Sequence, residues 1–122
     1  MSKNKFGVPC SYLKDKIKDV DIFCTSESEA MALAAGAWFA DKKSIVYMQN
    51  SGLGNIIDIV TSLYNTYGIP HPKLLLSVRH TPEHHEEMFR CTYEILDLLG
   101  YNNYEQIVQP FNKKTSNKKH NE

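Results

Sequence analysis

The sequence predicts a single α/β domain in which helices cover both faces of a mainly parallel β-sheet, giving three layers. Short apolar runs alternate with helical patterns along the chain, and this alternation is typical of βαβ units. The run Ser44–Gln49 is almost continuously apolar, as a central parallel strand is when both of its faces are covered. The length of 122 residues and the lack of an internal repeat favour one domain. We therefore expect a doubly wound fold of the flavodoxin-like or Rossmann-like kind.

The predicted elements follow one another in alternation. Strands are expected at Lys5–Val8, Asp21–Thr25, Ser44–Gln49, Lys73–Val78 and Tyr104–Val108. Helices are expected at Ser11–Val20, at Ser26–Ala40, from the turn Asn50–Asn55 to Tyr67, and at Thr81–Leu99. Gly68 is expected to end the third helix in a left-handed conformation, and Gly100 follows the fourth. Because the residues beyond Pro110 are polar, we expect a domain at 1–109 and a disordered tail at 110–122.

The composition argues against several classes of partner. The 14 Lys and Arg residues are balanced by 14 Asp and Glu residues, so no basic excess would draw the chain to nucleic acid. No apolar stretch approaches the roughly 20 residues of a membrane span, and no signal peptide is visible. The cysteines Cys10, Cys24 and Cys91 form no C-x-x-C pair and indicate neither a disulfide framework nor a zinc site. We expect a cytoplasmic protein that binds neither nucleic acid nor membrane.

Three groups of polar residues follow predicted strands, where ligands collect at the carboxyl edge of an open α/β sheet. The first group is Thr25–Glu29, with Glu27 and Glu29 at the start of an Ala-rich helix. Two interpretations stay open. The acids cap the helix and complement its dipole, or a buried glutamate donates and accepts protons.

The second group is the turn Gln49–Asn55, whose glycines Gly52 and Gly54 allow the backbone to approach a ligand closely. The turn is no Walker loop, because the Gly-Lys-Ser/Thr ending is absent, and it lacks the full dinucleotide-binding pattern. A purely structural turn is the other interpretation.

The third group is Arg79–Glu86, which is dense in residues that bind anions or exchange protons. Its histidines suggest a metal site, but Pro82 between His80 and His84 works against a shared helical face, so we assign no metal ligand. A solvated start of the next helix is the alternative interpretation.

Several motifs, taken together and in order, resemble one enzyme family. They are Gly7–Cys10, Glu27, Ala32–Gly36, Tyr47–Asn55, Thr61–Tyr64 and Ile69-Pro70. This set resembles the pyrimidine-binding domain of thiamine diphosphate-dependent decarboxylases, above all the sulfopyruvate and phosphonopyruvate decarboxylases. The likeness spans Gly7 to Leu99, and the details at Val8–Cys10 and Leu63-Tyr64 are nearest to alpha subunits of sulfopyruvate decarboxylase.

The resemblance implies roles for residues of all three groups. It implies that Glu27 is the catalytic glutamate, which hydrogen-bonds N1′ of the cofactor's aminopyrimidine. The implied contacts of thiamine diphosphate are Glu27, Gln49, Asn50, Ser51, Gly52 and Leu53. The implied contacts of the substrate, a 2-oxo acid such as sulfopyruvate or phosphonopyruvate, are Asn50, Asn55, Arg79, His80 and His85. The implied reaction releases carbon dioxide, with the cofactor supplying the difficult chemistry.

The family's second domain holds the diphosphate and Mg²⁺ with a Gly-Asp-Gly segment and a downstream Asn, and this pattern is absent from the sequence. The resemblance therefore implies a beta subunit that supplies it, in a hetero-oligomer of two alpha and two beta subunits or a larger one. Two other hypotheses stay open: a non-catalytic assembly or regulatory subunit of such an enzyme, and a stand-alone flavodoxin-like binding module.

Overall fold

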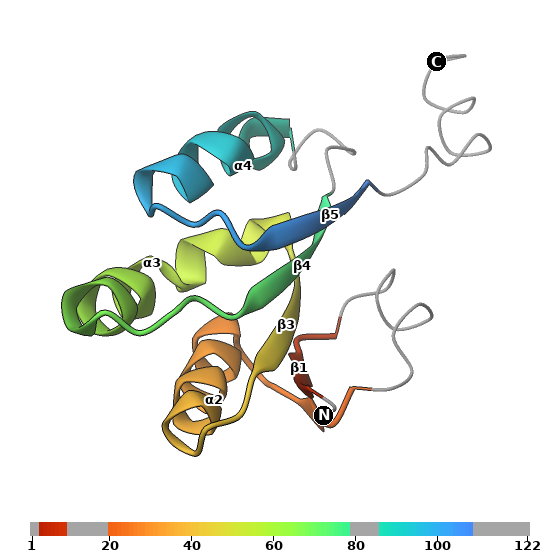
Figure 1. Cartoon of the computed structure of the whole chain (residues 1–122). Coiled ribbons are helices and arrows are strands. Elements are labelled where there is room, and N and C mark those ends of the chain that lie inside the picture. The colour runs from red at the N-terminus through yellow and green to blue at the C-terminus, as the bar shows by residue number, and fades with distance from the viewer. Residues whose placement is uncertain (1–2, 10–19, 79–85, 109–122) are drawn as a thin grey trace, which may run out of the picture.

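The computed structural model describes residues 3–9, 20–78 and 86–108 of the chain. The strands are β1 (Asn4–Gly7), β2 (Ile22–Phe23), β3 (Ser44–Gln49), β4 (Lys73–Val78) and β5 (Tyr104–Val108). The helices are α2 (Glu27–Phe39), the 3₁₀-helix η1 (Asn50–Asn55), α3 (Ile57–Ile59), the π-helix η2 (Val60–Asn65) and α4 (Glu86–Leu98). From β2 onward, strands and helices alternate as the sequence predicts (Figure 1).

All five strands are parallel and form one sheet in the order β2-β1-β3-β4-β5. Phe6 of β1 lies beside Ile22 on one side and Val46 on the other, so β1 separates β2 from β3. This strand order is the flavodoxin-like one, and ligands of such sheets bind at its switch point, between β1 and β3. The α/β class predicted from the sequence is confirmed.

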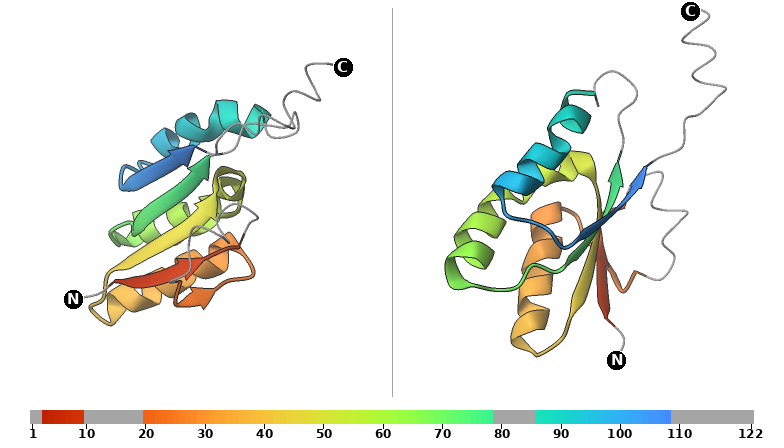
Figure 2. Two further views of the ribbon diagram at one scale, coloured as in Figure 1. Left: turned by 90° about the vertical axis from the view of Figure 1, so that its right-hand side faces the viewer. Right: turned by 45° about the horizontal axis from the view of Figure 1, so that its top comes forward.

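The described helices all lie on one face of the sheet (Figure 2, right). Under them β3 and β4 bury five apolar side chains completely: Val46, Met48, Leu74, Leu76 and Val78. Helix α2 packs closely here because its buried side consists of small residues and one methionine: Ala30, Met31, Ala34 and Ala35. On the other face Tyr47 packs with Val20, Ile45 and Leu75. The predicted helix Ser11–Val20 lies outside the described residues apart from Val20, as does the predicted tail 110–122.

Most predicted boundaries hold. The strands β3, β4 and β5 have the predicted limits, and α2 begins after Ser26, whose Oγ accepts a hydrogen bond from the Glu29 amide at 3.2 Å. Strand β2 is shorter than predicted, since only Ile22 and Phe23 pair with β1 at the edge of the sheet. The first five residues predicted for the last helix, 81–85, lie outside the described part of the chain. None of the described helices is long and apolar enough to cross a membrane.

The helix between β3 and β4 departs from the uniform helix that the sequence predicts. It begins as α3 and continues as the π-helix η2, in which the buried Tyr64 donates a hydrogen bond from its hydroxyl to the Met31 carbonyl of α2 at 2.6 Å. Gly68 ends the helix with φ +69°, and the Ile69 amide donates to the Tyr64 carbonyl, as in a Schellman cap. The left-handed conformation predicted for Gly68 is confirmed.

Candidate functional site

Two of the three polar groups meet at the carboxyl edge of the sheet. Strand β2 leads into the start of α2, and β3 leads into η1. Because the strands are parallel, their arrowheads lie at the same edge (Figure 2, left), and only β1 separates β2 from β3. The start of α2 and the turn η1 are therefore brought together beside the switch point of the sheet.

The two acids at the start of α2 have different roles. Oε1 of Glu29 accepts hydrogen bonds from the Thr25 amide at 2.7 Å and the Thr25 hydroxyl at 3.1 Å. Together with the Ser26 hydroxyl bond to the Glu29 amide, this is a capping arrangement of the kind the pattern predicts. Glu27 takes no part in it. The capping interpretation is thus confirmed for Glu29, and the carboxylate of Glu27 is left to contact η1.

The half-buried side chain of Glu27 lies against η1, where it contacts Gly52 and the last residue of the turn, Asn55. Asn55 donates a hydrogen bond from Nδ2 to Oε1 of Glu27 at 2.8 Å. Gly52 is buried under the same side chain, and a β-carbon on Gly52 would lie 2.5 Å from Cγ and 2.7 Å from Oε2 of Glu27. Such contacts are too short for any real side chain, so this packing requires a glycine at residue 52. The structure thus groups Glu27, Gly52 and Asn55.

Gln49 and Ser51 lie in the same turn and bond to each other. Nε2 of Gln49 donates to Oγ of Ser51 at 3.0 Å. Ser51 is exposed and Gln49 is half-buried, so both residues reach the surface at this turn. Their hydroxyl and amide groups can both donate and accept hydrogen bonds, which suits a heteroaromatic ring or a carboxylate.

Asn50 and Leu53, which the resemblance also assigns to ligand binding, anchor the turn. Asn50 is 1% exposed and donates from Nδ2 to Oγ1 of Thr92 on α4 at 3.1 Å, while Thr92 donates to the Met88 carbonyl at 2.6 Å. Leu53 is completely buried in the core, so only its backbone can face a ligand. Both residues fix η1 between α2 and α4.

Thr92 is a residue that the sequence analysis misses. It is completely buried and accepts the Asn50 bond, yet it lies in the middle of α4 with no motif around it. Its spacing offers a signal, because Thr92 precedes the buried Leu96 by four residues and so lies on the core side of the helix. A polar residue at such a position needs a buried partner.

Of the third polar group, the structure describes only Glu86, the first residue of α4. Arg79, His80 and His85, which the resemblance assigns to substrate binding, lie outside the described residues. Within 3–9, 20–78 and 86–108, no three His, Cys, Asp or Glu side chains gather into a group that could hold a metal ion.

Cys24, between β2 and α2, is a buried thiol close to this edge. Burial raises the pKa of Cys24, the nearby charge of Glu29 raises it further, and a hydrogen bond with the Gly7 backbone opposes both effects. A thiol with a raised pKa stays protonated at neutral pH and is a poor nucleophile. Cys24 is therefore a packing residue of the core.

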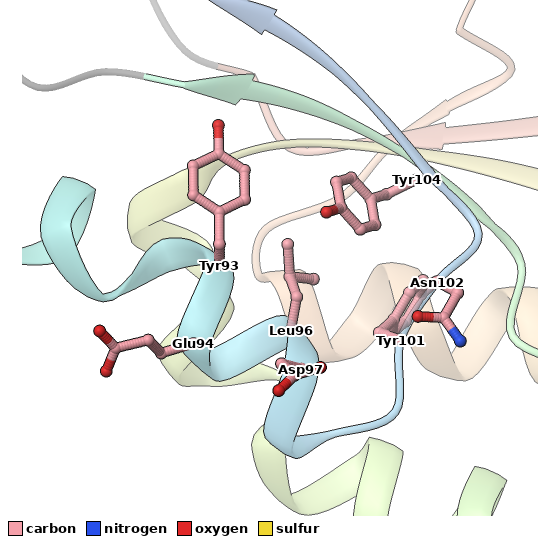
Figure 3. Close-up of a pocket in the computed structure, with 7 residues that line it drawn as sticks. All are labelled: Tyr93, Glu94, Leu96, Asp97, Tyr101, Asn102 and Tyr104. Atoms are coloured by element: carbon pink, nitrogen blue, oxygen red, sulfur yellow. The ribbon is translucent and has the colours of Figure 1, made fainter.

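Two surface hollows lie away from the start of α2 and η1. One, of about 370 Å³, lies between α4 and β5, where Leu96 sits between the rings of Tyr93 and Tyr104 (Figure 3). The other, of about 470 Å³, includes His71, just before β4, and Gly100, after α4. Neither is lined by Glu27 or by a residue of η1.

His71 is held by contacts on several sides. Its Nε2 donates to Oδ1 of Asn65 at 2.6 Å, since a carboxamide oxygen can only accept. Its ring stacks on Tyr101, with centroids 4.3 Å apart, and meets Tyr64 edge-on. Burial lowers the pKa of His71, so the neutral ring is the form that the fold prefers.

The chain matches curated proteins of one kind, whereas no family model matches it. It is 40% identical over 89 residues to the sulfopyruvate decarboxylase subunit alpha of Methanocaldococcus jannaschii, a match covering 67% of this chain and 51% of that protein. The corresponding subunit of Methanothermobacter thermautotrophicus is 38% identical over 104 residues, covering 76% and 62%. The phosphonopyruvate decarboxylase of Streptomyces viridochromogenes is 38% identical over 104 residues, covering 75% and 26%.

The chain therefore spans less than two thirds of the length of each of these relatives. All of these matches are nevertheless decarboxylases with one of two names, and further relatives at 37% and 42% identity carry the same two names. The chain is thus a relative of the sulfopyruvate and phosphonopyruvate decarboxylases, and the resemblance of its motifs to these two kinds of decarboxylase is confirmed.

Proposed function

We propose that this chain binds the pyrimidine end of thiamine diphosphate and serves as the alpha subunit of a 2-oxo acid decarboxylase. In this proposal a beta subunit holds the diphosphate and Mg²⁺, and the two chains form a hetero-oligomer. Sulfopyruvate or phosphonopyruvate is the proposed substrate, because the relatives are named for these two acids. Their naming as alpha subunits supports the partner.

One observation carries the proposal: the half-buried carboxylate of Glu27 is held at the carboxyl edge of the sheet with a hydrogen bond to one of its two oxygens. Asn55 donates to Oε1, while no described residue hydrogen-bonds Oε2. The backbone of Gly52 lies directly beneath this side chain, and Cγ, Cδ and Oε2 of Glu27 occupy the space that a β-carbon on residue 52 would need. A half-buried carboxyl group beside a side-chain-free backbone fits a flat heteroaromatic ring with a basic nitrogen.

The chain's own residues would then act on the proton at that nitrogen. The bound cofactor supplies the group that attacks the 2-oxo acid and accepts the electrons released with carbon dioxide. Oε2 of Glu27 donates a proton to the ring nitrogen and takes it back. Gly52 leaves room for the Glu27 side chain to lie in this position, and the paired side chains of Gln49 and Ser51 offer hydrogen bonds next to the ring.

The test is the substitution Glu27→Gln, with Glu29→Gln as the matched control two residues away. The chain is co-purified with its partner subunit, and carbon dioxide release from sulfopyruvate, phosphonopyruvate and pyruvate is measured with and without thiamine diphosphate and Mg²⁺. We expect cofactor-dependent release that falls by about 10²-fold or more in Glu27→Gln, because positioned proton transfer contributes that much. Glu29→Gln keeps an oxygen that can accept the Thr25 bonds and is expected to retain activity near that of the wild type.

Two outcomes would contradict the proposal. Release that does not depend on thiamine diphosphate would exclude the cofactor, and an unchanged rate in Glu27→Gln would remove the assigned proton transfer. A complex that binds thiamine diphosphate but releases nothing from any of the three acids would instead favour a non-catalytic subunit.

A further inference from the structure

Asn55, the last residue of η1, bonds to a glutamate 28 positions earlier in the sequence. Its Nδ2 lies 2.8 Å from Oε1 of Glu27, a normal distance for a hydrogen bond to a charged oxygen. Both residues are accessible to water, so water could satisfy either side chain. The hydrogen bond therefore forms because the fold places η1 against α2, and not because either side chain is buried away from water.

The chemistry of the amide decides which carboxyl oxygen carries a proton. An asparagine Nδ2 can only donate, so Oε1 acts as an acceptor whether Glu27 is charged or neutral. A proton on Glu27 then resides on Oε2, the oxygen beside Gly52. Without Asn55 no hydrogen bond from a described residue would distinguish the two oxygens, and rotation of the carboxyl group could exchange them.

We propose that Asn55 is a positioning residue, which fixes Oε2 as the oxygen through which Glu27 exchanges its proton. The inference rests on the proposed function, because it concerns the same contact between Glu27 and the pyrimidine. In each exchange Glu27 gives up or takes one proton at Oε2, and no other bond of Glu27 or Asn55 changes. Asn55 thus acts through Glu27 and need not touch the substrate, in contrast to the substrate-binding role that the resemblance implies.

Three substitutions at residue 55 separate this role from packing. Asn55→Ala removes the donor. Asn55→Asp keeps the size of the side chain but replaces the donor by a carboxylate that faces Glu27. The two negative charges then repel each other, in addition to the loss of the hydrogen bond. Asn55→Gln restores a donor on a side chain one methylene longer. Asn103→Asp is the matched control, since Asn103 is also exposed and donates to a carbonyl, that of His71, at 3.1 Å.

The first measurement needs no cofactor. Side-chain amide resonances of Asn55 and Asn103 are recorded by ¹H–¹⁵N NMR in the full-length chain and in its Glu27→Gln variant. We expect the Asn55 resonances to shift in Glu27→Gln while those of Asn103 stay in place. Unchanged Asn55 resonances would show that the pair does not form in solution and would overturn the inference, leaving the proposed function standing.

The second measurement uses the complex with the partner subunit, titrated with thiamine diphosphate and Mg²⁺ and then assayed with sulfopyruvate. A lost hydrogen bond to a charged group corresponds to about a tenfold weaker interaction or more. We expect Asn55→Ala to weaken thiamine diphosphate binding by about that factor and to lower kcat with little change in KM for the acid. We expect a larger loss in Asn55→Asp, partial recovery in Asn55→Gln and wild-type behaviour in Asn103→Asp.

The outcomes are distinguishable. If the wild-type complex binds thiamine diphosphate and Asn55→Ala and Asn55→Asp bind and turn over like it, the positioning role is overturned alone. If the wild-type complex binds no thiamine diphosphate, the proposed function fails and the positioning role fails with it, even if NMR shows the Glu27–Asn55 pair.

Discussion

Glu27 lies so close to the backbone of Gly52 that a β-carbon at residue 52 would come within 2.5 Å of its Cγ. Backbone conformation is not the reason for this glycine, because the only described glycines with positive φ are Gly68 and Gly100. Gly54, two residues further along the same turn, has nothing within 4 Å of an added β-carbon. Only the first glycine of the turn is therefore required by the packing of Glu27.

This difference predicts opposite outcomes for two alanine substitutions. In Gly52→Ala the flexible side chain of Glu27 can turn away, so we expect a loss of stability of no more than about 1–3 kcal/mol. The carboxylate then leaves Asn55, and we expect thiamine diphosphate binding by the complex to weaken about tenfold or more. Gly54→Ala is the control and should match the wild type in both respects. Wild-type affinity in a folded Gly52→Ala variant would contradict the prediction; titration calorimetry provides the measurement.

A second prediction concerns the buried bond between η1 and α4. Thr92→Val keeps the shape of the side chain but removes the oxygen that accepts from Asn50. We expect the free energy of unfolding in urea to fall by about 1–3 kcal/mol, the usual cost of removing the partner of a buried donor. Thr61→Val is the control, because the Thr61 hydroxyl is exposed on its helix and bonds only to nearby carbonyls. Equal effects of the two substitutions would show that the Asn50–Thr92 bond has no special role.

The link between η2 and α2 predicts a similar contrast between two tyrosines of one helix. Tyr64 is 1% exposed and its hydroxyl bonds to the Met31 carbonyl, whereas Tyr67 is 73% exposed. We expect Tyr64→Phe to lower the free energy of unfolding by about 1 kcal/mol. We expect Tyr67→Phe to change it by less than about 0.5 kcal/mol. Denaturant unfolding followed by circular dichroism measures both, and a Tyr64→Phe variant as stable as the wild type would count against the bond.

His71 predicts a pH dependence of stability. Burial lowers the pKa of His71 below its ordinary value, so the unfolded chain binds this proton more tightly than the folded chain does. The free energy of unfolding should therefore fall as the pH drops through about 6.5, the ordinary histidine value, towards the lower pKa of the folded state. His71→Phe keeps a ring to stack on Tyr101 but cannot titrate.

The measurement is urea unfolding of both proteins between about pH 7.5 and pH 5, where ordinary histidines titrate. We expect the loss of stability on acidification to be smaller in His71→Phe than in the wild type. The other histidines are common to both proteins, so the difference between the two curves isolates residue 71. Parallel curves would mean that His71 titrates alike in the folded and unfolded states.

The sequence predicts the strands better than it predicts the contacts between segments. The limits of β3, β4 and β5 follow from apolar runs, which are local, and so does the cap formed by Ser26 and Glu29. The pairing of Glu27 with Asn55 depends on the spatial order of the strands in the sheet. It is the placement of β2 and β3 on either side of β1 that brings α2 beside η1. No local pattern contains that information.

Other features escape prediction for related reasons. The bond from Asn50 to Thr92 joins residues 42 positions apart. From the sequence alone, the polar side chain of Asn50 in a turn is interpreted as a ligand contact, because its partner Thr92 cannot be recognised. The π-helix η2 carries Tyr64, whose bond to the Met31 carbonyl of another helix joins residues 33 positions apart and is likewise invisible to a local pattern. The predicted contacts of Arg79, His80 and His85 stay predictions, because these residues lie outside the described chain.

The anchoring of η1 has a consequence for the thermodynamics of ligand capture. Leu53 in the core, Asn50 on α4 and Asn55 on α2 hold the turn at three points before any ligand arrives. A flexible turn would lose conformational entropy on ordering around a ligand, at about 1–2 kcal/mol for each residue fixed. Because the turn is already ordered by the fold, a ligand that binds beside Glu27 loses less of its contact energy to this ordering and binds more tightly.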